Sequence, residues 1–447
     1  MKTIEPADGL VIRESVRLKP GVYPAPNGLR IEGDGVTLCG EGVVLVGSDR
    51  QGVGLTVKGN GCRVQGLRIL EYEHGIRADK VAKLQLLANH VTGTAEIAPN
   101  TIFLDIWRTA DEAYGAAVLL VDVDDSLVEK NDFQHQMNGI LTYGCRNLNV
   151  RQNQCSYNSG FGIHLYDTCD SLFEENSVDY CCRFEPREGP RHFGHIGADA
   201  TGFLVVYGSS RNRFLRNTAR LGGDGFFVAG LTPKLEKRPC NDNLFEENDG
   251  SLSPNIAFEC TFCSGNRFVD NYADRSNYGF WLGYSWDTQV EGNRMLMNRQ
   301  AGIAVENGYG MRVRHNTFQG GGHGVLLWSR YDEGFLAAYP NAATCHDWQI
   351  EHYSFARNGV GIRIAADQDH GIRQAPGVRG RPESRPRNIA LRHNDIQDNR
   401  VGIDLYCCDD ILVESNLLNR NVESNLRQQD CDRITARNNT GSAGGYL

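Results

Sequence analysis

One short motif constrains this chain more than any other feature: a small residue followed by an apolar, a variable and an apolar position. Its copies are GILT, GIHL, GFLV, GFFV, NIAF, GFWL, GIAV, GVLL, GIRI and GIDL, which begin at Gly139, Gly162, Gly202, Gly225, Asn255, Gly279, Gly302, Gly324, Gly361 and Gly402. Where nothing is inserted, the motif returns after 22 to 24 residues. Short alternating strands repeated at a period of this size predict a solenoid of stacked β-strands.

A column of asparagines supports the same period. Five of them follow the first residue of their motif by fourteen positions: Asn153, Asn176, Asn293, Asn316 and Asn416. The corresponding positions of other copies hold Asn217, Asn248, Asn271 and Asn394. Asparagine tolerates left-handed backbone geometry, and stacked asparagine side chains can bond to one another from turn to turn. We therefore expect these residues to form a structural ladder.

The repeat and the opening segment VRLKPGVYPAPNGLRIEGDGVTLCGEGVVLVG resemble the right-handed parallel β-helix superfamily, over about Leu18 to Asn439. This superfamily includes pectate-lyase-like proteins, NosD-type periplasmic repeat proteins and mannuronan epimerases. The resemblance implies an all-β, single-domain right-handed parallel β-helix whose rungs, the full turns of the chain around the helix axis, have about 22–24 residues. It leaves the chemistry open, because a fold does not determine a reaction.

Most of the 447 residues carry the repeat, so we expect residues 1–20 to be an N-terminal cap and 21–447 to be the β-helix. Longer intervals between motifs predict loop insertions near 93–114, 182–200, 231–240, 329–347 and 366–388. Loops of this length are usually functional or disordered. The insertions 231–240 and 329–347 should stand as walls at one edge, and the three uninterrupted rungs between them should form the floor of a groove.

The net charge of −9 argues against a nucleic-acid partner, whose binding needs clustered cations. No apolar run is long enough to span a membrane, so we expect no membrane partner. The first residues lack the apolar core of a signal peptide, which favours the cytoplasm unless a signal was removed. The fourteen cysteines are then expected to be reduced core thiols without zinc-type spacing, and we predict neither a metal nor a cofactor.

Two glutamates suggest a reaction. If the second and fourth motif residues point inward, the third and fifth face solvent, which places Glu259 and Glu306 in one outward column with Gly283 between them. Their Cα atoms would be about 9.6 Å apart. Inverting glycoside hydrolases hold an acid and a base carboxyl about 6.5–9.5 Å apart. Asp287, in the turn after Gly283, is a third candidate acid.

Aromatic residues around this column suggest sugar binding. The same alternation turns Trp281 and Trp328 outward, where flat aromatic faces suit sugar rings and exposed aromatic patches usually mark a binding site. The alternative is that the loop after Trp328 folds over them as a satellite cluster. Further substrate-binding candidates are Tyr284, Trp286, Arg330 and His164.

We therefore predict a carbohydrate-active enzyme acting on an oligo- or polysaccharide, foremost a glycoside hydrolase with Glu259, Glu306 and Asp287 as its carboxylates. One alternative is a polysaccharide lyase or epimerase acting on uronic acids, which would use the arginine-rich segment 371–388 to neutralise the uronate. Another is a non-catalytic carbohydrate-binding solenoid. The sequence leaves a homo-oligomer open.

Overall fold

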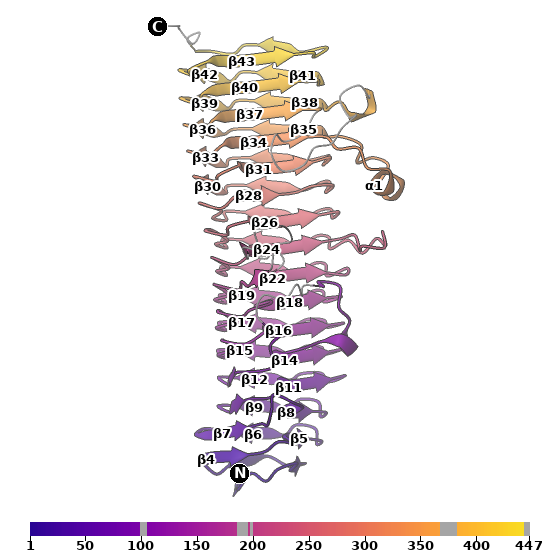
Figure 1. The fold of residues 1–447 in the computed structure, drawn as a ribbon, viewed down its shortest axis with the longest axis vertical. Coiled ribbons are helices and arrows are strands. Elements are labelled where there is room, and N and C mark those ends of the chain that lie inside the picture. The colour runs from indigo at the N-terminus through magenta and orange to yellow at the C-terminus, as the bar shows by residue number, and fades with distance from the viewer. Residues whose placement is uncertain (99–104, 186–194, 197–199, 367–381, 442–447) are drawn as a thin grey trace. The chain divides into compact units, whose positions relative to one another are not determined.

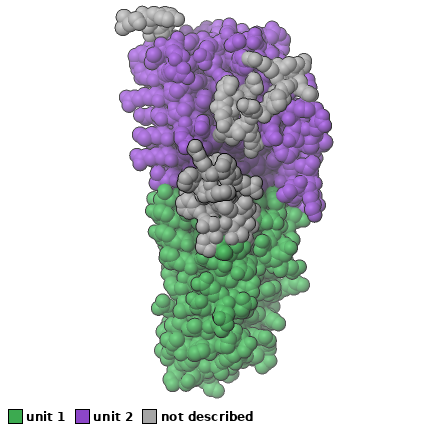
Figure 2. All heavy atoms as spheres, in the orientation of Figure 1, with its two compact units in different colours: residues 1–227 green, residues 228–447 purple. Residues whose placement is uncertain are grey.

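A computed structural model describes residues 1–98, 105–185, 195–196, 200–366 and 382–441 of the chain. Nearly all regular structure consists of short β-strands, and all but one pair of them stack in parallel on the corresponding strands of neighbouring rungs (Figure 1). The chain divides into two compact units, residues 1–227 and 228–447, which Figure 2 colours green and purple.

In residues 1–227, three series of parallel strands stack rung on rung. The first series, whose strands carry the glycine motif, comprises β2 (Val11–Ile12), β5 (Leu29–Ile31), β8 (Val53–Val57), β11 (His74–Asp79), β14 (Ala116–Val121), β16 (Asn138–Tyr143), β18 (Ile163–Tyr166) and β22 (Thr201–Val206). The second comprises β1 (Lys2–Ile4), β3 (Val16–Leu18), β6 (Thr37–Cys39), β9 (Arg63–Gln65), β12 (Gln85–Leu87), β15 (Leu127–Glu129), β17 (Asn149–Arg151), β19 (Leu172–Glu174) and β23 (Arg213–Leu215). The third is β4 (Gly21–Pro24), β7 (Val43–Val46), β10 (Arg68–Leu70) and β13 (His90–Thr92).

The same three series build residues 228–447. The first comprises β26 (Ile256–Thr261), β28 (Tyr278–Trp281), β31 (Ala301–Glu306), β34 (His323–Trp328), β37 (Val360–Ala365), β40 (Val401–Tyr406) and β43 (Ser424–Gln429), and β24 (Asp224–Ala229) crosses the unit boundary. The second comprises β25 (Leu244–Glu246), β27 (Arg267–Val269), β29 (Gln289–Glu291), β32 (Arg312–Arg314), β35 (His346–Glu351), β38 (Arg387–Arg392), β41 (Asp409–Glu414) and β44 (Thr435–Arg437). The third is β30 (Arg294–Leu296), β33 (Thr317–Gln319), β36 (Ser354–Ala356), β39 (Asp395–Gln397) and β42 (Leu417–Asn419).

The remaining elements are short and interrupt the repeat. They are the helix α1 (Glu333–Ala338), the 3-10 turns η1 (Ala110–Glu112) and η2 (Pro382–Ser384), and an antiparallel pair of β20 (Phe184–Glu185) and β21 (His195–Ile196). Asp332 caps α1 by accepting a hydrogen bond from the Phe335 backbone N–H. Among the described residues, no helix has both the length and the hydrophobicity needed to cross a membrane.

Side chains of the same kind stack along the core from rung to rung. Phe258 lies over Phe280 with ring centroids 5.0 Å apart and planes 11° apart, and Phe268 packs against Phe280 edge-on at 5.5 Å. All three rings are fully buried. Each buried ring stabilises the fold by about 2–3 kcal/mol through apolar surface removed from water. This stacking also fixes which residues of neighbouring strands lie opposite one another.

The predicted asparagine ladder is present. Asn293 donates from Nδ2 to Asn316 Oδ1 at 2.9 Å, and its own Oδ1 accepts bonds from the backbone N–H and side-chain Nδ2 of Asn271. The same pattern links Asn153 to Asn176 in the other unit. These side chains are buried, so each amide satisfies backbone groups that would otherwise be unpaired at a turn.

Candidate functional site

The outer face of strands β26, β28, β31 and β34 carries the two predicted catalytic glutamates, but in different columns. Phe258 pairs with Phe280, so Glu259 lies opposite Trp281, and Trp281 lies opposite Ala304. Glu306 lies two positions further along its strand and faces Trp328. The prediction of one shared column is therefore wrong.

The reason for this difference is the packing of the core. The sequence alignment paired Asn255 with Gly279, whereas stacking of Phe258 on Phe280 shifts the register by two residues. The Cα atoms of Glu259 and Glu306 are then separated by two strand spacings and two residues, about 12 Å. Gly283 lies beside Glu306 and not between the glutamates, because a Cβ at Gly283 would be 3.7 Å from the Glu306 Cβ.

Glu306 is buried, with 1% of its surface exposed, and not solvent-facing as predicted. The indole Nε1 of Trp328 donates to Glu306 Oε2 at 2.9 Å, and the Arg330 guanidinium lies 3.7 Å from Oε1. Burial raises the pKa of the nearby Tyr284 hydroxyl, and the negative charge of Glu306 raises it further. Glu259, by contrast, is half-buried.

Trp281 and Trp328 point outward from the sheet, but the expectation that they are exposed is wrong. Only 9% and 1% of their surfaces are accessible. Their rings pack edge to face at 5.2 Å, and Tyr278 packs against Trp281 at 4.9 Å. They belong to a buried cluster with Ile256, Tyr278, Ala301, Ala304 and Leu326. Alternation along the strand keeps these two indoles out of the inner core, and packing them together on the outer face still removes their apolar surface from water.

A second cluster lies at the turns that follow these strands. Tyr284 is buried there with Phe262, whose ring stacks on it at 4.7 Å, and with Tyr339. Leu231 comes from the insertion 231–240, and Tyr339 comes from the insertion 329–347. The two insertions predicted as walls are thus in one cluster with residues of the uninterrupted rungs between them.

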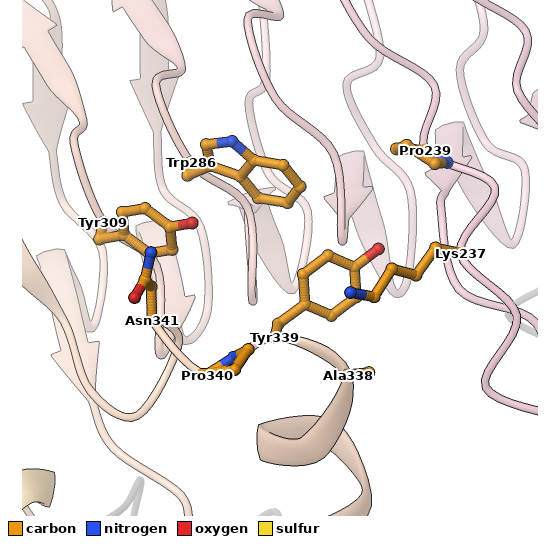
Figure 3. Close-up of a pocket in the computed structure, with 8 residues that line it drawn as sticks. All are labelled: Lys237, Pro239, Trp286, Tyr309, Ala338, Tyr339, Pro340 and Asn341. Atoms are coloured by element: carbon orange, nitrogen blue, oxygen red, sulfur yellow. The ribbon is translucent and has the colours of Figure 1, made fainter.

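An open pocket of about 330 Å³ lies against this cluster (Figure 3). Its lining residues are Lys237, Pro239, Trp286, Tyr309, Ala338, Tyr339, Pro340 and Asn341. Trp286 and Tyr309 come from equivalent turns of neighbouring rungs, where they form a parallel backbone bridge. We call this the aromatic pocket.

Three rings form a stacked row at the aromatic pocket. Trp286 and Tyr309 are nearly parallel, at 9° and 6.0 Å, and His346 stacks on the other side of Tyr309 at 4.9 Å. Tyr339 faces Trp286 at 5.5 Å with a tilt of 48°. Trp286, Tyr309 and His346 are partly exposed to solvent, whereas Tyr339 is buried.

Polar groups stand among these rings. The Lys237 ammonium lies 4.9 Å from the centre of the Tyr339 ring, a cation–π contact. Burial raises the pKa of the Tyr309 hydroxyl, while a hydrogen bond with Asn341 partly opposes that rise. His346 is fixed by the Asn341 carbonyl at Nε2 and by Asp347 at Nδ1. The pocket therefore combines flat apolar faces with a few fixed polar groups.

Asp287, the third predicted acid, is exposed and does not line the aromatic pocket. Its carboxylate covers the next turn at Gly310, where a Cβ would be 2.5 Å from Asp287 Oδ1 and φ is +64°. The same arrangement recurs between Asp270 and Gly292. This repetition indicates a turn-forming role for Asp287, because a left-handed turn under a carboxylate requires glycine.

His164, predicted to bind substrate, lies in the other unit, on β18. Only 2% of it is exposed, and burial lowers its pKa to about 3. Its ring is surrounded by the rings of Tyr143, Phe161 and Tyr166. Nδ1 has no hydrogen-bond partner among the described residues. His164 is thus a neutral imidazole in an aromatic environment.

This burial predicts a pH-dependent stability. The unfolded chain protonates His164 near the ordinary pKa of 6.5, whereas the folded protein does so only near 3. The free energy of unfolding should therefore be highest above pH 6.5 and fall toward pH 3, by up to about 1.4 kcal/mol per pH unit. Urea denaturation between pH 7 and pH 4 measures this slope.

The matched variant is His164→Leu, because Leu141 and Leu204 occupy the same column on the neighbouring strands. It should remove about half of the slope or less between pH 7 and pH 4. His74, whose pKa burial lowers to about 4, contributes nearly as much over this range, and burial also lowers the pKa of His323. His135→Gln, at an exposed position, should leave the slope unchanged. A slope that persists in full in His164→Leu would contradict this account.

Arg330 is the second residue of the insertion 329–347, and both its backbone and its side chain contact neighbouring residues. Its backbone N–H donates to Asn307 Oδ1 at 2.9 Å, and its guanidinium lies between Glu306 and Asp332. Residues 371 to 381 of the arginine-rich segment proposed to bind a uronate are outside the described part of the chain. Of its remaining arginines, Arg385 forms two hydrogen bonds with Asp409.

Sequence reasoning found Trp286 but missed Tyr309, Tyr339, Lys237 and Asn341. A signal for Tyr309 was present, since it follows Trp286 by 23 residues, the same interval that separates Gly279 from Gly302. The other three lie in insertions, which do not carry the repeat and therefore give no periodic signal. Their approach to Trp286 depends on how each loop folds back.

Comparisons with known proteins found no match among curated protein sequences. Among solved structures, the chain is similar to the Dettilon tailspike protein with 14% identity and a TM-score of 0.41, covering 70% of this chain and 59% of that one. It is also similar to the periplasmic alginate epimerase AlgG, with 12% identity and a TM-score of 0.44 over 94% and 79% of the two chains. The catalytic domain of a GH87 alpha-1,3-glucanase in complex with nigerose gives 10% identity and a TM-score of 0.43 over 99% and 68%.

The stacked parallel strands agree with a sequence profile described as the right handed beta helix region. The profile matches residues 106–252 and 235–335, which together make up just over half of the chain. This protein therefore belongs to the right-handed parallel β-helix family.

Proposed function

We propose that this protein binds a carbohydrate in the aromatic pocket. The supporting observation is the set of three rings, Trp286, Tyr309 and Tyr339, that line one open pocket of about 330 Å³. Sugar rings present C–H groups on one face, and such a face packs well against an aromatic ring. A volume of this size lies within the usual range of small-molecule sites.

The polar lining defines which sugars fit. The Asn341 amide and the Tyr309 hydroxyl can exchange hydrogen bonds with sugar hydroxyls. Among the described lining residues, Lys237 is the only charged one, and it is exposed. A neutral or acidic sugar is therefore compatible with the pocket, whereas an amino sugar carrying a free ammonium would be repelled.

None of the described residues that line the pocket carries a carboxylate, so we assign binding and not hydrolysis to it. The test is a titration of the full chain with neutral and acidic oligosaccharides, followed by calorimetry and by tryptophan emission. Trp281, Trp328 and Trp348 are buried, so an emission change on binding reports chiefly on Trp286 or Trp107. Absence of both heat and an emission change for every oligosaccharide at millimolar concentration would refute the proposal.

Glycoside hydrolysis is a second candidate, carried by Glu259 and Glu306. Both lie on the outer face of the same strand series, two strands apart. A Cα separation of about 12 Å still allows two long side chains to bring their carboxyls within the 6.5–9.5 Å of an inverting pair. The half-buried Glu259 and the buried Glu306 also have different environments, which an acid and a base require.

On this second candidate, Glu259→Gln and Glu306→Gln should each lower kcat of hydrolysis by at least about 100-fold, since each removes one proton-transfer group. Glu306→Gln retains an acceptor for Trp328, so the fold should persist, as binding in the aromatic pocket can verify. Glu291→Gln, at a surface pair with Arg314, is the matched control and should retain full activity. Wild-type turnover that survives both substitutions would exclude these glutamates.

A further inference from the structure

Two cysteines on neighbouring rungs of residues 228–447 lie opposite one another. Cys408 follows β40 by two residues, and Cys431 follows β43 by two residues. Because Tyr406 pairs with Gln429, the two cysteines share a register position. Their sulfur atoms are 3.6 Å apart.

This arrangement is compatible with a disulfide bond. Register partners on neighbouring parallel strands have Cα atoms about 4.8 Å apart, inside the 4.4–6.8 Å range of disulfides. The Asp409–Asp432 bridge continues the pairing just beyond the two cysteines. Closing the sulfur–sulfur distance to a bond of about 2.05 Å requires side-chain rotation only.

The two thiols differ in access and in acidity. Cys408 is buried, whereas Cys431 is partly exposed. A hydrogen bond from the Cys408 thiol lowers the pKa of Cys431 to about 6, and the same contact raises the pKa of Cys408. Cys431 is thus the accessible thiolate that can attack an external disulfide, and the buried Cys408 is the thiol next to it that can resolve the mixed disulfide.

We propose that Cys408 and Cys431 form a reversible disulfide that ties the rung of β43 to the rung of β40. The oxidant is a low-molecular-weight disulfide such as oxidised glutathione. The Cys431 thiolate attacks one sulfur of this reagent and expels one thiolate. Cys408 then loses its proton and attacks Cys431 Sγ in the mixed disulfide, which expels the second thiolate. Two protein thiols are oxidised, and the reagent is reduced to two thiols.

Other cysteines in the chain provide internal controls. Cys240 and Cys263 also occupy matching positions on neighbouring rungs, with the Cys240 N–H 3.3 Å from Cys263 Sγ, but both are fully buried. Cys407 adjoins Cys408 and is buried. Cys182 is the other partly exposed cysteine, and burial raises its pKa. Each lacks either the access or the acidity found at Cys431.

The disulfide would act on the last strand of its series, which has a neighbour on one side only. Among the described strands, β43 pairs only with β40, and β44 pairs only with β41. The side chains of β43 are exposed or half-buried. A bond that closes a segment of 23 residues restricts local opening of this rung, so its amides should exchange with solvent roughly tenfold more slowly when oxidised.

The test uses the full chain in a glutathione redox buffer, followed by trypsin digestion and mass spectrometry. Arginines at 400, 420, 427 and 433 place Cys408 in the peptide 401–420 and Cys431 in the peptide 428–433. A linked pair of these peptides should appear in wild type, Cys407→Ser and Cys240→Ser, and be absent from Cys408→Ser and Cys431→Ser. Hydrogen exchange in β43 should slow on oxidation in wild type and stay unchanged in Cys431→Ser.

Three results would overturn the proposal. One is a glutathione adduct that persists on Cys431 without an internal link. Another is a link through Cys407, shown by its loss in Cys407→Ser. The third is oxidation of Cys182 before Cys431, because it would show that exposure alone decides the reaction.

Discussion

Trp286→Ala should weaken saccharide binding by about 30-fold or more, the effect of removing a residue that contributes at least about 2 kcal/mol to a complex. The Trp286 ring lies in the row with Tyr309 and also faces Tyr339, so its loss opens the pocket from both sides. The backbone N–H of Trp286 bonds to the Cys263 carbonyl and is unaffected by the substitution. Calorimetric titration of the best ligand from the oligosaccharide panel measures the change.

Two further variants separate the role of the ring from a general effect. Trp286→Phe keeps a flat apolar face and should recover part of the affinity. Tyr272→Ala removes an aromatic residue that is 44% exposed and lies outside the pocket, so it should bind like wild type. If Trp286→Ala remains folded and binds as tightly as wild type, the aromatic pocket is not the carbohydrate site.

Asn293→Ala should reduce the free energy of unfolding by about 3 kcal/mol or more, because it leaves several buried polar groups without partners. Asn293 Nδ2 donates to the Phe268 and Glu291 carbonyls as well as to Asn316 Oδ1. Its Oδ1 accepts two bonds from Asn271. Alanine replaces none of these hydrogen bonds, and its smaller side chain leaves part of the asparagine volume unfilled.

Urea denaturation and hydrogen exchange of β27 and β29 measure this loss. The control is Asn277→Ala, which lies off the ladder and bonds through its side chain to Arg299 at the surface. It should change the free energy of unfolding by less than about 0.5 kcal/mol. Equal effects of the two substitutions would mean that the ladder contributes no more than an ordinary surface bond.

The fold could be predicted because its determinants are local and periodic. The glycine motif and the asparagine at position fourteen repeat with the rung, so each copy confirms the next. The register of one rung could not be read in the same way, since Asn255 occupies the place of a motif glycine while Phe258 pairs with Phe280. The stacking of Phe258 on Phe280 in the core determines that alignment, and it places Glu259 opposite Trp281.

The candidate site was predictable only in part. Alternation along a strand predicts the face on which Trp281 and Trp328 lie, but it does not predict what packs on that face, and both are buried. Trp286 was identified because it lies in the turn that follows Gly283, close to the end of β28. Lys237 and Tyr339 reach it from insertions whose paths depend on contacts between distant segments, and the sequence contains no period that reports them.

The aromatic pocket has one further property, which follows from the position of its walls. Lys237 belongs to the insertion after β24, and Tyr339 belongs to the insertion after β34, while β26, β28 and β31 lie between these strands. The width between the walls is therefore set by a whole number of repeats, each contributing about 4.8 Å. Duplication or loss of one repeat would lengthen or shorten the binding surface by one such step without disturbing either wall. In this architecture, the length of the ligand that is accommodated can evolve by copying units, independently of the residues that hold it.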